Sequence, residues 1–155
     1  ASETLFSEHY VALTASGWRP SDGRRGATLS AAQLAQASLV TAAPTATFHD
    51  GVDRMLTALQ LGGRVVLRTR HHGALPLLVT GSDLLAIVPL MYARSLLPRY
   101  DLRLWELPGH GPAYDVRMLW HDSVTQDPGH QWLRDLVRTL FARPAPAERK
   151  PKRAR

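Results

Sequence analysis

The sequence predicts an α/β fold. Three observations lead to this class. Residues 64–92 follow the order strand, polar elbow, short helix and second strand; residues 45–62 repeat apolar side chains at helical spacing; and residues 114–120 alternate with the period of a strand. Short apolar runs rich in Val and Leu are typical of strands inside a parallel sheet. We therefore expect strand–helix–strand units built on such a sheet.

The first elements are defined by turn and cap signals. Leu5–Ala15 is predicted as a strand, followed by a charged, turn-rich loop over residues 16–28 that we expect to be mobile. Ser30 and Gln33 form a capping-box pattern, which predicts a short helix through about Ala37. A brief strand over residues 38–41 follows.

The next helix is predicted over Thr45–Gly62, because its apolar residues recur every three or four positions. Gly62 is expected to end it, and Asp50 or the hydroxyl of Thr47 to cap its start. That cap places three residues at an elbow before the helix: Thr47, Phe48 and His49.

The central unit begins with a strand at Val65–Leu67 that we expect to be buried. An elbow over residues 68–73 leads to a buried helix over residues 74–80. Pro76 suits a first helical turn, and Gly81 is the residue type that most easily takes a left-handed position after a helix. A second buried strand, Leu84–Val88, is closed by Pro89.

The elbow of the central unit is the first candidate binding site. In open α/β sheets, ligands bind beyond the carboxyl ends of the strands, where helix N-termini present free N–H groups. Four residues lie at this position: Arg70, His71, His72 and Gly73. With the elbow at His49, we expect two helix N-termini to face one cleft and to bind a carboxylate by charge-assisted hydrogen bonds.

The last third contains a helix over residues 90–97, a strand over 101–107 and an alternating strand over 114–120. Asp127 followed by Pro128 predicts the start of a final helix. Its apolar stripe is expected to belong to the core: Trp132, Leu133, Leu136, Val137, Leu140 and Phe141.

Composition and charge exclude several classes of protein. A chain of 155 residues with 45% hydrophobic residues is long enough for one folded domain, and the absence of cysteine excludes disulfides and thiolate chemistry. Residues 143–155 hold six basic residues and one acidic residue, so this tail carries +5 of the formal net charge of +6. We expect the tail to be disordered, with a salt-sensitive contact to nucleic acid or an acidic partner as the alternative.

Metal-dependent and nucleophilic catalysis are not predicted. Seven histidines include HD and HH pairs at His49, His71 and His121, but none has the HExxH spacing that places two imidazoles on one helical face. No G-x-S-x-G elbow or Gly-rich phosphate loop occurs, and Ser82 reads as a turn residue. We therefore expect no catalytic residue, metal or cofactor; a small hydrolase would need one of these.

Three segments in order, GSDLLAIVP, MLWH and DPGHQWLR, resemble the effector-binding domain of LysR-type transcriptional regulators. Within that family the resemblance is to the regulators of nodulation genes and of nitroaromatic degradation, and it spans roughly residues 5–142. It implies a type II periplasmic-binding-protein-like fold, in which two α/β subdomains are joined by two crossover strands and bind the effector between them.

The resemblance also implies a domain plan. Residues 1–142 would form the C-terminal part of the effector-binding domain, with the second subdomain at about 10–89, a return to an incomplete first subdomain at about 90–142, and the basic tail at 143–155. His49 would match the histidine of the subgroup's loop, while Ile87 and Pro89 would lie near the crossover. The subgroup usually has an aromatic side chain where His72 stands.

The function implied by the resemblance is ligand sensing. The chain would bind a small effector, by analogy an aromatic carboxylate, and transmit binding to a winged-helix DNA-binding domain that lies outside these residues. Because the first subdomain lacks strand neighbours, we expect exposed sheet edges and self-association as a dimer or tetramer. No signal peptide or membrane segment is visible, so a cytoplasmic location is expected. The alternative is a stand-alone small-molecule-binding protein of the same fold.

Overall fold

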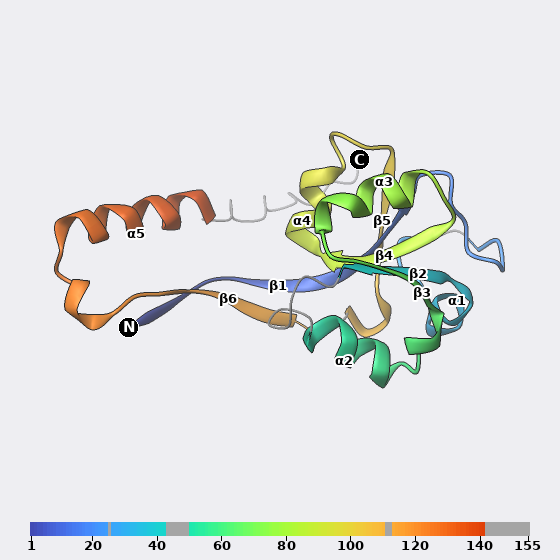
Figure 1. The fold of residues 1–155 in the computed structure, drawn as a ribbon, viewed down its shortest axis with the longest axis horizontal. Coiled ribbons are helices and arrows are strands. Elements are labelled where there is room, and N and C mark those ends of the chain that lie inside the picture. The colour runs from blue at the N-terminus through green and yellow to red at the C-terminus, as the bar shows by residue number, and fades with distance from the viewer. Residues whose placement is uncertain (25, 43–49, 111–112, 142–155) are drawn as a thin grey trace, which may run out of the picture. The chain divides into compact units, whose positions relative to one another are not determined.

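The computed structural model describes residues 1–24, 26–42, 50–110 and 113–141 (Figure 1). Its strands are β1 Ser2–Ala15, β2 Ser38–Ala42, β3 Val65–Thr69, β4 Leu84–Pro89, β5 Leu102–Glu106 and β6 Ala113–Leu119. Its helices are α1 Ala31–Gln36, α2 Asp50–Ala58, α3 Leu75–Thr80, α4 Leu90–Leu96 and α5 Pro128–Phe141. The predicted α/β class is confirmed.

The described strands form one six-stranded sheet in the order β3-β2-β4-β1-β5, with β6 paired to β1. β2 is parallel to both β3 and β4, whereas β1 is antiparallel to β4 and to β5. The predicted strand–helix–strand unit therefore exists as β3–α3–β4. Its two strands are not neighbours, because β2 lies between them.

The chain divides into two compact units. The central unit is Glu8–Tyr114, and the terminal unit consists of Ala1–Ser7 with the described residues from Asp115 onward. β1 passes from one unit to the other between Ser7 and Glu8, and β6 does so between Tyr114 and Asp115. The predicted subdomain boundaries at residues 10–89 and 90–142 stay a prediction.

The sheet of the central unit is covered on both faces, as Figure 1 shows. One face packs against α1 and α2 through a cluster that includes Leu34, Leu39, Leu56 and Leu85. The opposite face packs against α3 and α4 through Val40, Leu75, Val88 and Leu90, among others. Alternate residues of each strand thus serve two separate cores.

Local cap signals predicted the starts of two helices correctly. The hydroxyl of Ser30 accepts from the Gln33 amide at 3.2 Å, and the Gln33 side chain accepts from the Ser30 amide at 2.8 Å, which completes the capping box of α1. At α5, Asp127 Oδ1 accepts from the His130 amide at 2.8 Å, with Pro128 as the first helical residue.

The predicted end of the amphipathic helix is wrong. α2 ends at Ala58, and Gln60 adopts the left-handed conformation with φ 56°. This conformation lets the Leu61 amide donate to the Leu56 carbonyl at 2.7 Å, which closes the helix before Gly62 is reached. Gly81 is likewise not left-handed, since its φ is −92°.

The predicted burial of β3 and of α3 is wrong in part. β3 is an edge strand, so Val66 is 62% exposed and Leu67 is also exposed. In α3, Leu75 and Val79 are buried but Leu77 is exposed. The prediction for β4 is confirmed, because β4 lies inside the sheet.

The apolar stripe of α5 is not part of the core of the described chain. Leu140 is 70% exposed and Trp132 67%. The buried residue of α5 is Arg134, whose guanidinium donates to the carbonyls of Val124 and Thr125 at 3.3 and 2.7 Å. These hydrogen bonds satisfy the one buried charged side chain of α5. The predicted basic tail lies outside the described residues.

Candidate functional site

The carboxyl ends of β2, β3 and β4 lie at the same edge of the sheet, because the three strands are parallel. In open α/β sheets this edge is where ligands bind. β3 leads from it into the elbow before α3, and β4 ends at Pro89, the residue before α4. The candidate site is therefore built from strand ends of the central unit.

The elbow is held by hydrogen bonds to its backbone. Thr69 Oγ1 accepts from the His71 amide at 3.3 Å, and the Tyr92 hydroxyl donates to the His72 carbonyl at 2.6 Å. The Tyr92 ring also meets the His72 ring edge-on, with centroids 5.7 Å apart. Burial raises the pKa of Tyr92, so its hydroxyl stays a donor at neutral pH. Tyr92 thereby ties the elbow to α4.

The structure brings together one group of the predicted site residues. Arg70, His71 and Gly73 are exposed side by side at the elbow, while His72 is half-buried. Their elbow leads into α3, on the face that α3 and α4 cover. Thr47, Phe48 and His49 lie outside the described residues, so the expected pairing of two helix N-termini is not described.

The other predicted residues lie elsewhere. Ile87 is buried on the face covered by α2, opposite to the face of α3. Pro89 is half-buried and stands opposite Tyr10 in the pairing of β4 with β1. The predicted site residues thus lie at one edge of the sheet but on both of its faces: the elbow on the face of α3, and Ile87 on the face of α2.

Three polar residues that the sequence did not single out come together where β1 enters the central unit: Glu8 and Tyr10 of β1, and Tyr114 of β6. The carboxylate of Glu8, which is buried, accepts from the amides of Met91 and His9 at 2.9 Å each. The rings of Tyr10 and Tyr114 lie 5.4 Å apart. Only the pairing of distant segments creates this group; the run of apolar residues in 10–13 made Tyr10 look like strand bulk.

Comparison with known proteins decides the family. A model described as the LysR substrate binding domain matches residues 1–142. The chain belongs to this family. The match confirms the resemblance drawn from the sequence and favours the ligand-sensing domain of a regulator over a stand-alone binding protein.

The curated relatives of this LysR domain are transcriptional regulators. NagR of Ralstonia sp, an HTH-type transcriptional activator, is 27% identical over 138 residues, which are 89% of this chain and 44% of NagR. NahR of Pseudomonas putida, another such activator, is 30% identical over 95 residues, 61% of this chain and 32% of NahR. Nodulation protein D 2 of Bradyrhizobium diazoefficiens is 29% identical over 95 residues, 57% of this chain and 29% of that protein. The chain spans less than half the length of these relatives.

Solved structures support the fold. A putative transcriptional regulator from Vibrio parahaemolyticus superposes with a TM-score of 0.71 at 24% identity, over 92% of this chain and 65% of that one. The effector binding domain of QuiR in complex with shikimate gives a TM-score of 0.65 at 14% identity, again over 92% and 65%. The LysR domain therefore has the periplasmic-binding-protein-like fold that was expected.

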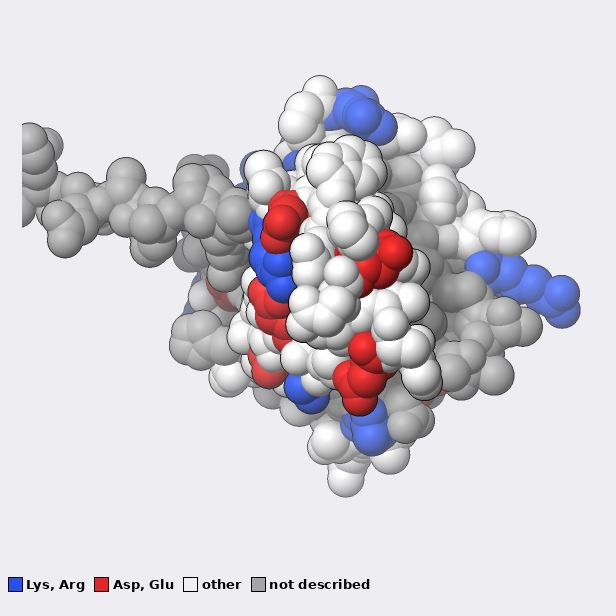
Figure 2. Space-filling view, turned by 90° about the vertical axis from the view of Figure 1, so that its left-hand side faces the viewer, with Lys and Arg blue, Asp and Glu red and all other residues white. Residues whose placement is uncertain are grey.

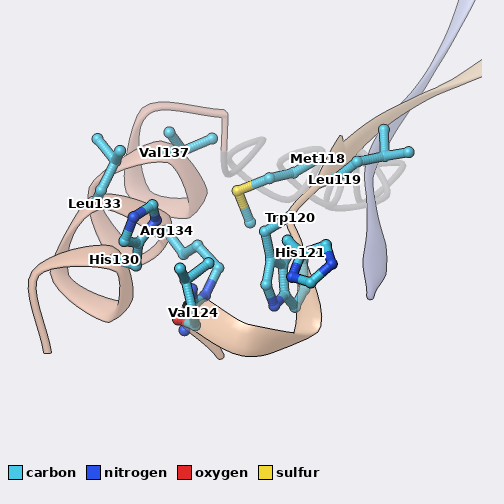
Figure 3. Close-up of a pocket in the computed structure, with 9 residues that line it drawn as sticks. All are labelled: Met118, Leu119, Trp120, His121, Val124, His130, Leu133, Arg134 and Val137. Carbon is cyan, nitrogen blue, oxygen red and sulfur yellow. Dashed lines mark hydrogen bonds between the residues drawn. The ribbon is translucent and has the colours of Figure 1, made fainter. Parts of the chain in front are cut away.

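The terminal unit of the LysR domain contains an apolar hollow of about 460 Å³ between β6, the following turn and α5 (Figure 3). Met118, Leu133 and Val137 line it, with His121 and His130 at its rim. The Arg134 guanidinium lies 5.0 Å from the centre of the Trp120 ring and is already occupied by two carbonyls. The hollow therefore offers apolar contact rather than an anion site.

The described part of the LysR domain shows neither a metal-binding cluster nor a large charged patch on the face drawn in Figure 2. Within residues 1–24, 26–42, 50–110 and 113–141, no three His, Asp or Glu side chains come together as a metal site. Figure 2 shows acidic and basic side chains in small separate groups on the face it presents. No helix in the described ranges is long and apolar enough to cross a membrane.

Proposed function

We propose that this chain senses a small anionic effector, of the aromatic carboxylate class, for a LysR-type transcriptional regulator. The observation that carries the proposal is the elbow at the carboxyl edge of the parallel strands, where Arg70 and His71 are exposed next to a backbone that Tyr92 holds in place. A cationic side chain at such an edge favours a carboxylate.

The relatives and the fold support the choice of effector class. The relatives are activators and a nodulation protein, none of them named as an enzyme, so we assign no catalysis. QuiR, which shares the fold, is described with shikimate, a small carboxylate. Thr47, Phe48 and His49 remain proposed effector contacts, as do Ile87 and Pro89 on the strand that ends at this edge of the sheet.

Binding acts at a distance in this proposal. An effector shifts an equilibrium only by its difference in affinity for two states, so the states must differ at the sensing site. The readout would be a winged-helix DNA-binding domain on the same full-length polypeptide, in the cytoplasm, within a dimer or tetramer. DNA would be contacted through that domain and not through the residues described.

A titration tests the proposal. A panel of benzoate, substituted benzoates and shikimate is added to the 155-residue chain, and amide shifts are followed by NMR. We expect saturable shifts around residues 70–73 with an aromatic member, and weakening by about three- to tenfold in Arg70→Ala, since a charge-assisted contact at an exposed site is modest. Arg94→Ala, an exposed change on α4, is the control. Absence of saturable shifts with every compound would refute the proposal.

A further inference from the structure

Glu8 is the buried carboxylate among the described residues of the central unit, and it lies where β1 enters that unit. It is 4% exposed, and both of its oxygens accept hydrogen bonds: Oε1 from the His9 amide and Oε2 from the Met91 amide, each at 2.9 Å. A carboxylate is costly to bury, and an apolar side chain of similar size is buried at less cost. What the carboxylate contributes is therefore these two hydrogen bonds.

The hydrogen bond to Met91 holds the first turn of α4. α4 begins at Leu90, directly after Pro89, and this N-cap residue offers no side-chain acceptor. The first amides of a helix have no acceptor within that helix. Glu8 supplies one from a strand residue 83 positions earlier in the chain. The position of this turn therefore depends on β1.

Tyr92, in the same turn of α4, connects the helix to the elbow. Its hydroxyl donates to the His72 carbonyl at 2.6 Å, and the Leu75 amide at the start of α3 donates to the same carbonyl. The elbow backbone is thus held by two donors, one of which α4 carries. Arg70 and His71, the exposed side chains of the elbow, directly precede this carbonyl.

We propose that Glu8 is a positioning residue for the elbow and acts on it through the first turn of α4 and through Tyr92. The Glu8 carboxylate fixes that turn, and the turn carries the hydroxyl that holds the His72 carbonyl. Where it concerns effector affinity, this inference rests on the proposed function. Coupling between two sites is reciprocal, so an effector that binds better with the Glu8 contact intact strengthens that contact by the same factor. Occupancy of the elbow then acts on β1 where the strand enters the central unit.

Amide hydrogen exchange of the chain without ligand tests this connection. Glu8→Ala removes the acceptor of the α4 turn, and Tyr92→Phe removes the hydroxyl that reaches the elbow. Because local opening of the elbow governs exchange there, we expect the Leu75 amide to exchange about tenfold faster in both variants. Glu8→Gln keeps an acceptor oxygen for α4 and should restore the slow exchange.

The short turn of residues 62–64, before β3, is a matched control. There the Val65 amide donates to the Gly62 carbonyl in the same pattern, and within the described residues no α4 side chain bonds to this turn. The Val65 exchange rate should stay unchanged in every variant. Glu106→Gln on β5 alters a carboxylate that lies 3.4 Å from the His9 ring and not at α4, so it should change neither rate.

Two results of the exchange measurement would overturn the inference. Equal acceleration at Leu75 and Val65 would show that Glu8 only stabilises the fold. An unchanged Leu75 rate in Glu8→Ala would show that the elbow does not depend on the α4 turn.

Benzoate affinity gives the second test, as a double-mutant cycle. Glu8→Ala and Tyr92→Phe should each weaken binding about threefold, and the double variant also about threefold, because both changes interrupt one connection. A loss of about ninefold in the double variant would mean independent effects and would overturn the inference. If the parent chain binds no carboxylate of the panel, the proposed function fails, and the exchange rates alone decide this inference.

Discussion

The central and terminal units place their apolar side chains in opposite ways. In the central unit, strand alternation supplies two cores, and residues such as Leu13, Leu85 and Val88 are fully buried. In the terminal unit, Leu119 is 75% exposed, and Trp132 and Leu140 of the α5 stripe are mostly exposed. The comparison teaches that an apolar periodicity defines a helix or strand, whereas burial depends on a second layer to cover it.

The largest predicted difference concerns core truncation. Leu85→Ala, in the middle of β4, should lower the free energy of unfolding by about 3 kcal/mol, because it leaves a cavity in a packed core. Leu140→Ala should lower it by no more than about 0.5 kcal/mol. Urea denaturation measures both. Equal losses would show that the stripe of α5 is covered in solution and would remove the contrast between the units.

Removing a helix cap should also cost more free energy of unfolding in the central unit than in the terminal unit, with a smaller difference than for core truncation. Glu8→Ala removes the buried acceptor of the Met91 amide and should cost about 2 kcal/mol, whereas Asp127→Ala removes an exposed cap of α5 and should cost about 1 kcal/mol. Glu8→Gln, which keeps an acceptor oxygen, is the control. A larger loss for the Asp127 variant would reverse the ranking of the two units.

Acid should loosen the terminal unit through Glu3. The hydrogen bond from Arg138, at 2.7 Å, lowers the pKa of Glu3 below its ordinary value of 4.5. A lowered folded pKa means that the pair stabilises the fold above about pH 4.5 and that this contribution is lost as pH falls through the folded value. NMR titration of the Glu3 carboxyl carbon measures it. In Arg138→Gln the pKa should rise toward 4.5; no change would disprove the pairing.

The smallest effect on stability is expected for Trp132→Gln. Its ring is mostly exposed, so the free energy of unfolding should change by less than about 0.5 kcal/mol. The expected self-association should weaken, however, because the apolar surface of α5 becomes smaller. Sedimentation velocity over a range of concentrations detects this. An unchanged oligomer distribution would exclude α5 as the contact surface.

Local signals in the sequence predicted elements well. The capping box at Ser30 and the Asp127–Pro128 start of α5 involve residues within one helical turn, so the chain needs no distant partner to show them. The elbow before α3 was found in the same way. The edge position of β3 was not, because the order of strands in a sheet is set by contacts between segments.

The grouping of Glu8, Tyr10 and Tyr114 could not be predicted from the sequence either. Tyr10 and Tyr114 come from strands that are far apart in the sequence. The Glu8 carboxylate accepts from the Met91 amide in the first turn of α4, a helix that begins 82 positions after Glu8. Each looks ordinary within its own segment. Only the three-dimensional arrangement brings these residues together.

The division of β1 between two units bears on how the protein is made. Glu3 meets Arg138 at a separation of 135 residues, and Ser7 meets Asp115 at a separation of 108. During synthesis residues 1–7 of β1 leave the ribosome long before these partners exist, so we expect the start of β1 to stay unpaired until they are made. Chaperone capture and proteolysis of nascent chains should therefore concentrate on residues 1–7, until translation delivers α5.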